Sequence, residues 1–350
     1  MEQVITTFFG LPLTRFGLGC MLAMLFGLVV CGAWIIWSQG KGYGTFIRFA
    51  VCVVPLSWVF ARVFYVAADL IVAPIESSFY ANTIGNLMPA LYFWDGGYSL
   101  MGGIVGAVLG AKLAEKWTRT EKGALRDALA MGMPVAILLE RAFEKGTGLG
   151  LGRTVEWKWL AEAPWCASLP SGEKVHPVYL YEALAVGLLL IVTILLAARK
   201  KERKGGDVLR VFLFMYGLVQ VFLESLRQDG HMVKHFVHIS QVIAIILAVV
   251  VMLRWTVQTL QHPGHGDLPA GAVAHITPDG AEGYYVRLRR FRLGVAGGWV
   301  ITAVCIGVMI WAEFGVDRWG NRLLAYGIMV LCLVVVGVVG AVFHITANRE

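Results

Sequence analysis

Apolar stretches long enough to cross a lipid bilayer recur along the whole chain, and they constrain its fold more than any other feature. A spanning helix needs about 20 predominantly apolar residues. Spans are therefore expected near residues 16–37, 49–72, 99–114, 127–141, 181–198, 208–226, 239–253, 293–311 and 323–343. The third and fourth are short and interrupted by glycine or proline, which favours packing inside a bundle over exposure to lipid. The sequence predicts an all-α polytopic membrane protein, with a seven-helix bundle followed by about two extra C-terminal transmembrane helices.

The composition supports a lipid environment. Hydrophobic residues make up 58% of the chain and charged residues only 15%, a balance that water-soluble domains do not normally reach. The net charge is +7, but the basic residues fall in loops between the apolar stretches, where they act as topology signals. This distribution argues against a nucleic-acid surface, so no nucleic-acid partner is expected.

Basic loops alternate along the chain and predict its orientation. Lys and Arg are concentrated in residues 41–48, 116–126, 199–210 and 254–292. The positive-inside rule assigns such loops to the cytoplasm. We therefore expect the N-terminus outside, the C-terminus in the cytoplasm, and residues 142–175 facing outward.

The composition changes near the C-terminal third of the chain. Residues 261–283 are rich in glycine, proline and polar side chains, which is typical of a flexible linker. We predict a membrane core over residues 1–255, a cytoplasmic linker over 256–292 and a transmembrane hairpin over 293–350. The sequence lacks the internal repeats of many secondary transporters, which argues against a solute transporter or channel.

The cysteine and histidine patterns predict neither a disulfide framework nor a metal site. Five of the six cysteines lie in apolar segments, and no CxxC pair occurs. His231, His235 and His238 lie close together beside Lys234, but their spacing lacks the pattern of a further metal ligand, which favours an interfacial loop. We expect no metal and no cofactor.

Several ionisable residues interrupt apolar sequence and are candidates for function. Charged groups at membrane depth are costly, so they tend to mark sites. The candidates are Arg62, Arg141, Glu182, Glu224 and Arg227, with His176 near the same depth. The alternative is structural: each Arg extends to the interface or pairs with a Glu to hold helices together.

Five sequence strings occur in an order that suggests a known family. They are WDGGYSLMGGIVGA from Trp94, Arg141 followed eleven residues later by Gly152-Arg153, HPVYLYEAL from His176, Tyr216-Gly217 with Glu224 and Arg227-Gln228-Asp229, and ISQ from Ile239. Together they resemble the prolipoprotein diacylglyceryl transferase family over about Phe16 to Trp255. The resemblance implies a seven-helix protein of the bacterial cytoplasmic (inner) membrane with its N-terminus outside, in agreement with the charge pattern.

The resemblance also implies a reaction and its partners. A diacylglyceryl group moves from phosphatidylglycerol, or another anionic phospholipid, to the cysteine thiol of a prolipoprotein, with release of glycerol phosphate. The thiol must lose its proton, and the departing phosphate needs cations. Arg141 suits the phosphate through its planar fork, and the glycine-rich loop from Gly146 to Gly152 would let backbone N–H groups approach a headgroup.

We therefore assign two sets of site residues. The predicted catalytic set is Arg141, Glu144, His176, Glu182, Tyr216 and Gln220. The predicted lipid-binding set is Arg141, Gly102, Gly103, Gly152, Arg153, Arg62, Glu224 and Arg227. Tight helix packing is an alternative for the two glycines at 102 and 103. His176 and Glu182 are either partners in an ordering network or a proton-transfer pair.

The chain departs from the family pattern at four positions. Met101 replaces a histidine, Gln220 an arginine, Glu144 an asparagine and Phe16 a tyrosine. The first two changes remove a potential base and a positive charge, which are worth several kcal/mol each in an ordinary active site. They leave two hypotheses: a transferase with a divergent active site, or a non-catalytic or repurposed phospholipid-binding protein on the same fold.

Overall fold

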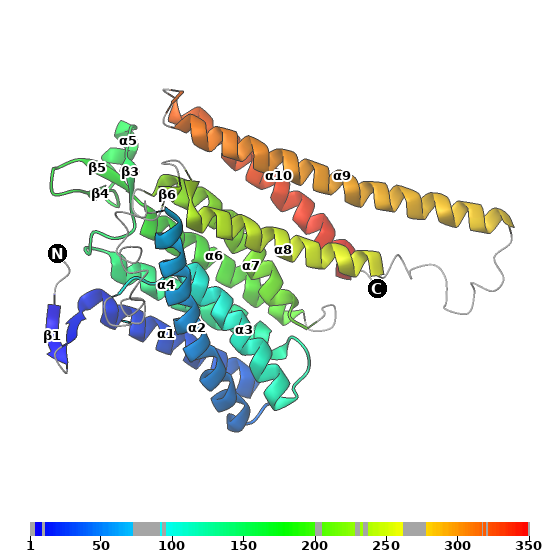
Figure 1. The fold of residues 1–350 in the computed structure, drawn as a ribbon, viewed down its shortest axis with the longest axis horizontal. Coiled ribbons are helices and arrows are strands. Elements are labelled where there is room, and N and C mark those ends of the chain that lie inside the picture. Colours follow the sequence, from blue (N-terminus) through cyan, green and yellow to red (C-terminus); the bar gives the residue numbers. More distant parts are fainter. Residues whose placement is uncertain are drawn as a thin grey trace. The chain divides into compact units, whose positions relative to one another are not determined.

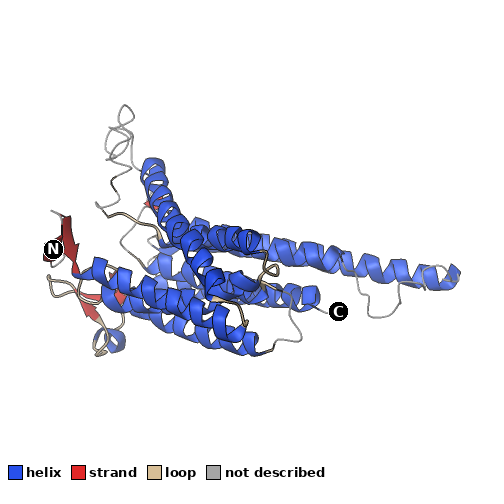
Figure 2. Cartoon of the chain, turned by 90° about the horizontal axis from the view of Figure 1, so that it is seen from below, coloured by secondary structure: helices blue, strands red, loops and turns tan. Residues whose placement is uncertain are grey.

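A computed structural model of the chain describes residues 4–8, 11–72, 92, 96–199, 205–227, 232–233, 237–261, 278–316, 318–319 and 321–348. Within these residues the structure is dominated by α-helices (Figure 2). Seven of the described helices are long and apolar enough to cross a membrane. The predicted all-α, multi-pass architecture is confirmed, and the orientation of the termini stays a prediction.

Two compact units make up the chain, residues Met1–Ala244 and Ile245–Glu350. All seven predicted core spans are helices (Figure 1). They are α1 (Arg15–Ala33), which continues as a π-helical segment η1 (Trp34–Ser38), α2 (Tyr43–Val72), α3 (Leu100–Thr118), α4 (Ala124–Glu144), α6 (Val178–Ala198), α7 (Asp207–Leu226) and α8 (Ile239–Gln261). Helix α8 is the one that runs from the first unit into the second.

The predicted fourth span, α4, lies in the interior of the first unit, and the predicted third span, α3, packs against α2 and α4. Neither is among the seven helices apolar enough to span alone, because each carries several charged residues within its length. Helix α4 contacts α1, α3, α6 and α7. A β-carbon added at Gly106 or Gly110 of α3 would lie within 3 Å of the backbone of α2, so these glycines allow two helices to approach closely. The predicted packing inside a bundle is confirmed for α4, whereas α3 packs closely on α2 but leaves Leu109, Leu113 and Trp117 exposed.

Two buried carboxylates fix the helix ends at the start of α4. Glu115 of α3 accepts hydrogen bonds from the backbone N–H groups of Gly123 and Arg126, at 3.0 and 3.1 Å. Asp127 of α4 accepts from the backbone N–H groups of Gly206 and Leu209, at 3.0 and 3.3 Å. The first turn of α7 would otherwise leave these N–H groups without intrahelical partners. Asp127 therefore joins α4 to α7 at one end of the bundle.

Replacing Asp127 with alanine is expected to lower the free energy of unfolding by about 2 kcal/mol, because two buried N–H donors lose a charged acceptor. Thermal unfolding of the purified protein in detergent measures this change. Glu121→Ala, at an exposed position in the preceding turn, is the matched control and should have little effect. Equal stability of the two variants would contradict the capping role of Asp127.

Short strands lie outside the helices, and the sequence did not predict them. Strands β1 (Val4–Phe8) and β2 (Leu11–Thr14) form an antiparallel pair before α1. Between α4 and α6 lie β3 (Leu151–Thr154), the short helix α5 (Lys158–Ala161), β4 (Ala167–Ser168) and β5 (Lys174–Pro177), in a sheet of order β3-β5-β4. Strands β6 (Met232–Val233) and β7 (Val237–His238) pair before α8. The sheet β3-β5-β4 lies at one end of the helices α4 and α6 that it connects (Figure 1).

The second unit contains the end of α8 and two further helices, α9 (Pro278–Val316) and α10 (Arg322–Asn348). The two predicted C-terminal spans are therefore helices. Trp299 of α9 donates a hydrogen bond to the Thr256 hydroxyl of α8 at 3.1 Å, and the ring centroids of Trp255 and His344 lie 5.1 Å apart. Residues 262–277 of the predicted linker lie outside the described residues. Both remaining ends of that linker are helical, and the three-part division of the chain stays a prediction.

Candidate functional site

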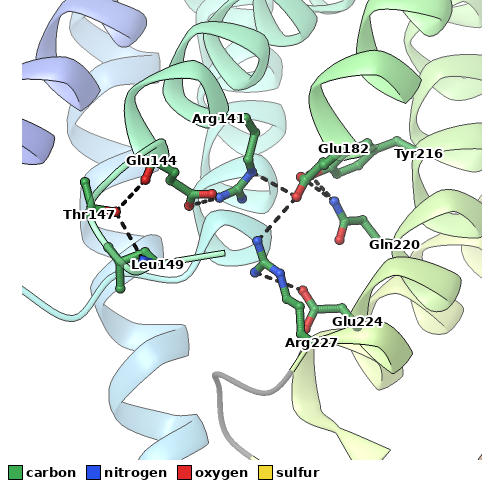
Figure 3. A network of polar contacts seen from close by, with 9 residues as sticks. All are labelled: Arg141, Glu144, Thr147, Leu149, Glu182, Tyr216, Gln220, Glu224 and Arg227. Carbon is green, nitrogen blue, oxygen red and sulfur yellow. Dashed lines mark hydrogen bonds and ion pairs between the residues drawn. The ribbon is translucent and has the colours of Figure 1, made fainter. Parts of the chain in front are cut away.

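A buried carboxylate, Glu182, lies at the centre of a polar network inside the first unit (Figure 3). Its exposed fraction is 0%. The Tyr216 hydroxyl of α7 donates a hydrogen bond to Glu182 Oε1 at 2.8 Å. The Gln220 amide donates to the same oxygen and, at 2.7 Å, to the Tyr216 hydroxyl. Tyr216 and Gln220 are four residues apart on one helix and therefore share a face.

Two guanidiniums meet the other oxygen of Glu182. Arg141 Nε, near the end of α4, lies 2.9 Å from Glu182 Oε2. Arg227 Nη2, directly after α7, lies 3.5 Å from the same oxygen. One carboxylate from α6 thus joins the ends of α4 and α7. A buried ion pair needs such additional partners to offset the cost of removing charges from water.

Each guanidinium also pairs with a second carboxylate. Arg141 Nη1 contacts Glu144, one turn further along α4. Arg227 Nη1 lies 3.4 Å from Glu224 Oε1. The other oxygen of Glu144, Oε2, is buried and has no hydrogen-bond partner among the described residues. Both arginines are therefore held from two sides (Figure 3).

The glycine-rich loop after α4 closes against this network. Gly146, Gly148 and Gly150 have φ angles of +83°, +85° and +65°, a region that favours glycine. The backbone N–H of Tyr179 donates to the Gly150 carbonyl at 3.0 Å, and Gly152 forms an isolated β-bridge with Arg227. The predicted spacing from Arg141 to Gly152 thus brings the two ends of the loop to the same site.

Three predicted lipid-binding residues of α2 and α3 have other neighbours. Arg62 is buried and donates to the carbonyl oxygens of Gly96 and Gly97, the second at 3.1 Å. A β-carbon at Gly102 would collide with Phe60 and Phe64 of α2. At Gly103 the nearest atom would be 3.7 Å away. Helix packing accounts for Gly102, and lipid contact at these positions stays a prediction.

His176 lies next to the network but belongs to a different set of contacts. Its Nδ1 is 3.4 Å from the Tyr181 hydroxyl, and its ring meets the Trp157 ring edge-on with centroids 6.3 Å apart. These contacts do not reach Glu182, its predicted partner. Burial lowers the pKa of the imidazole, and the nearby Glu156 carboxylate offsets part of this shift by raising it.

The lowered pKa of His176 predicts a pH-dependent stability. In the unfolded chain the imidazole takes up a proton below pH about 6.5, whereas the folded chain resists protonation until a lower pH. The contribution of the neutral imidazole to stability is therefore fully present above about pH 6.5 and is lost as the pH falls below this value toward the lowered pKa of the folded chain. Thermal unfolding across this range should show a steeper loss in Glu156→Gln, which lacks the offsetting charge. A loss that is unchanged in His176→Asn would assign the pH dependence to another group.

Comparison with known proteins identifies the family. The model of the prolipoprotein diacylglyceryl transferase family matches residues 3–257, which is more than two thirds of the chain. The chain belongs to this family. The match covers α1 to α8 almost completely and ends before α9.

Relatives agree with this family assignment. A phosphatidylglycerol–prolipoprotein diacylglyceryl transferase of Clostridioides difficile is 26% identical over 70% of this chain and 91% of its own length. One of Finegoldia magna is 26% identical over 72% of this chain and 94% of its own length. One of Leifsonia xyli is 28% identical over 69% and 75% respectively. This chain is thus a multi-pass membrane protein of a transferase family.

One carboxylate of the cluster, Glu140, is not among the site residues predicted from the sequence. Glu140 precedes Arg141 on α4 and interacts electrostatically with Arg141, Glu182 and Arg227. The sequence does contain a signal for Glu140, because this charged residue interrupts the same apolar stretch as Arg141. The described cluster therefore holds four carboxylates, at 140, 144, 182 and 224, around the guanidiniums of Arg141 and Arg227.

The remaining predicted residues are placed as follows. Arg153 lies on β3 and is half-buried, and Met101 is buried on α3 with an exposed fraction of 4%. Trp94, Asp95, Gln228, His231, Lys234 and His235 lie outside the described residues. Among the residues that are described, no group of three or more His, Cys, Asp and Glu side chains has a metal-binding arrangement.

Proposed function

We propose that this chain transfers a diacylglyceryl group from phosphatidylglycerol to the lipobox cysteine of a prolipoprotein, at the Glu182 network. The observation that carries the proposal is the pair of guanidiniums, buried Arg141 and partly buried Arg227, assembled on one carboxylate in a member of this family. Membership supplies the reaction, and the guanidiniums supply the cations that its leaving group requires. The bacterial cytoplasmic membrane, with the Glu182 network toward its outer side, is part of the proposal.

The reaction is a displacement at carbon. The thiolate sulfur of the acceptor cysteine attacks the terminal glyceryl carbon of the lipid, a C–S bond forms, and the C–O bond to phosphate breaks. Glycerol phosphate leaves with the bonding electrons, and the thiol proton passes to a base. A cysteine thiol has a pKa of about 8.5, so a neighbouring base accelerates its ionisation.

Arg141 is assigned to the phosphate. Its contacts among the described residues engage Nε and Nη1, so the Nη2 amine remains available to a phosphate oxygen in a nearly water-free site. Arg227 approaches Glu182 from the other side and adds a second positive charge. Gly102, Gly103, Gly152, Arg153, Arg62 and Glu224 are assigned to the surroundings of the bound lipid.

Glu144 is assigned as the base. Oxygen Oε1 holds Arg141, while the buried Oε2 has no hydrogen-bond partner among the described residues. A buried acceptor without a partner is costly unless a ligand or proton satisfies it. Glu182, Tyr216 and Gln220 position Arg141 and Arg227, and His176 supports the loop beside them.

Replacing Glu144 with glutamine should separate binding from turnover. Removal of one negative charge beside Arg141 should tighten phosphatidylglycerol binding about 5-fold. Loss of the base should lower the rate of transfer by about 100-fold. Lipid affinity is measured by quantitative native mass spectrometry of the detergent-purified protein, and the rate by single-turnover assays with saturating lipid. Glu173→Gln, in the exposed turn between β4 and β5, should change neither quantity. An unchanged rate for Glu144→Gln would remove Glu144 from the chemistry.

A transfer assay tests the proposed function directly. The purified chain is reconstituted in vesicles containing phosphatidylglycerol and mixed with a peptide that contains a lipobox cysteine. The expected product is a peptide whose mass has increased by one diacylglyceryl group. Binding of phosphatidylglycerol without this product would support the second candidate, a lipid-binding protein without catalysis. Gln220 favours that candidate, because an amide donates to Glu182 at the position where the family resemblance implies an arginine.

A further inference from the structure

The segment between α4 and α6, residues 145–177, presents two tryptophans on its surface. Trp159 on α5 has an exposed fraction of 70%, and Trp165, shortly before β4, one of 51%. Exposed indole rings are unfavourable in water, by about 25 cal/mol per Å² of apolar surface. Neither ring is needed by the Glu182 network, so a different contact must account for them.

Trp159 is held in place by the segment beneath it. Its ring stacks on Trp157 with centroids 6.2 Å apart and planes 11° from parallel. Trp157 in turn meets the ring of His176 on β5, and Leu160 of α5 is buried. The short helix α5 is thus packed on the sheet through one side and displays Trp159 outward.

The position of this segment along the chain indicates what covers the two rings. Helix α4 ends at Glu144, and α6, which is apolar enough to span a membrane, begins at Val178 directly after β5. The sheet therefore lies at the level of a bilayer surface. Tryptophan is enriched at this level, where the indole ring meets the acyl chains and its N–H meets the headgroups. Exposed Lys145 and Lys158 in the same segment can approach lipid phosphates.

We propose that Trp159, Trp165 and Lys158 form a surface that binds phospholipid at the interfacial level of the leaflet in which α6 begins. This lipid-facing surface anchors the segment between α4 and α6 to the bilayer. It does not depend on whether the Glu182 network transfers a lipid group. A peptide acceptor is a different occupant, but a surface at the bilayer boundary meets lipid in the absence of any partner.

The anchor has a direct connection to the candidate site. Strand β3 of the same sheet forms the backbone bridge between Gly152 and Arg227, and Gly150 just before it accepts a hydrogen bond from Tyr179. Lipid contact at Trp159 and Trp165 therefore fixes Gly150 and Gly152, which border the Glu182 network, relative to the membrane surface.

Photocrosslinking in vesicles tests the proposal. The photoreactive amino acid p-benzoylphenylalanine replaces Trp159 or Trp165 in the full chain, reconstituted in vesicles of phosphatidylcholine and phosphatidylglycerol. We expect lipid adducts, detected by mass spectrometry, at both positions. The same label at Ser171, in the exposed turn between β4 and β5, should yield at least about fivefold less lipid adduct. Equal yields at all three positions would overturn the proposal. An adduct to added lipobox peptide in place of lipid would do the same.

A second measurement keeps the aromatic ring at each position and so preserves the fold. The fluorescence lost in the double variant Trp159→Phe, Trp165→Phe reports these two rings. We expect this lost component to be quenched by lipids brominated near the carbonyl end of their acyl chains, and only weakly by iodide in the water. A component quenched by iodide and insensitive to brominated lipid would place both rings in water and contradict the anchor.

Discussion

Replacing Arg141 with alanine is expected to lower the rate of diacylglyceryl transfer by at least about 100-fold, the usual cost of removing a donor aimed at developing negative charge. Arg141 links Glu144 and Glu182 and is the guanidinium assigned to the departing phosphate. Arg141→Lys keeps the charge but loses the planar fork, so it should retain part of the lipid affinity and less of the rate. Single-turnover transfer in vesicles measures each variant.

The same substitution should also destabilise the protein, which makes a matched control necessary. Without Arg141, the buried carboxylates of Glu144 and Glu182 lose a partner, at a cost of about 3–5 kcal/mol. The double variant Arg141→Ala, Glu182→Gln removes one of these charges and should recover part of the stability, while transfer stays lost. Recovery of transfer along with stability would limit Arg141 to holding helices together.

Much of the helical architecture was predictable because each span carries its own signal. A run of about 20 apolar residues is recognisable without knowledge of the rest of the fold. The sheet between α4 and α6 was missed because its strands have only two to four residues, too few for an alternating pattern. The start of α9 was missed although Pro278 stands at its first position, where proline is common.

The sequence predicts the membrane depth of the candidate-site residues, but it is less informative about the side of the helix that each residue occupies. Arg141, Glu182 and Arg227 interrupt apolar sequence, and the structure brings them together. Arg62 interrupts apolar sequence in the same way, yet its contacts go to Gly96 and Gly97. Position along a helix gives membrane depth, whereas the side of the helix that a residue occupies depends on packing with neighbours far away in the sequence.

The structure shows what Gln220 contacts at the position where the family resemblance implies an arginine. Its amide donates to both Glu182 and Tyr216 and has an exposed fraction of 2%. A guanidinium at this position would be the third to meet Glu182, beside Arg141 and Arg227. The four carboxylates of the cluster would partly offset the repulsion among like charges, but the longer side chain must fit a close-packed interior.

Introducing the two residues that the family resemblance implies, through Met101→His together with Gln220→Arg, is the decisive test between enzyme and lipid-binding protein. We expect the native chain to support growth of a strain depleted of its own transferase, because the proposed function assigns the chemistry to Glu144 and the paired arginines. The double variant should then do no better, or do worse through strain at position 220. Immunoblots of the membrane fraction check that the native chain and the double variant are present in equal amounts.

Gln220→Met is the matched control, since it preserves volume but removes the donors to Glu182 and Tyr216. We expect it to lower complementation, because two buried acceptors lose a hydrogen bond at about 1–3 kcal/mol each.

The opposite complementation result for the native chain and the double variant Met101→His, Gln220→Arg would support the second hypothesis. If the native chain fails and the double variant grows, the cluster lacks the base and charge that transfer requires, and the native protein binds phospholipid without catalysis.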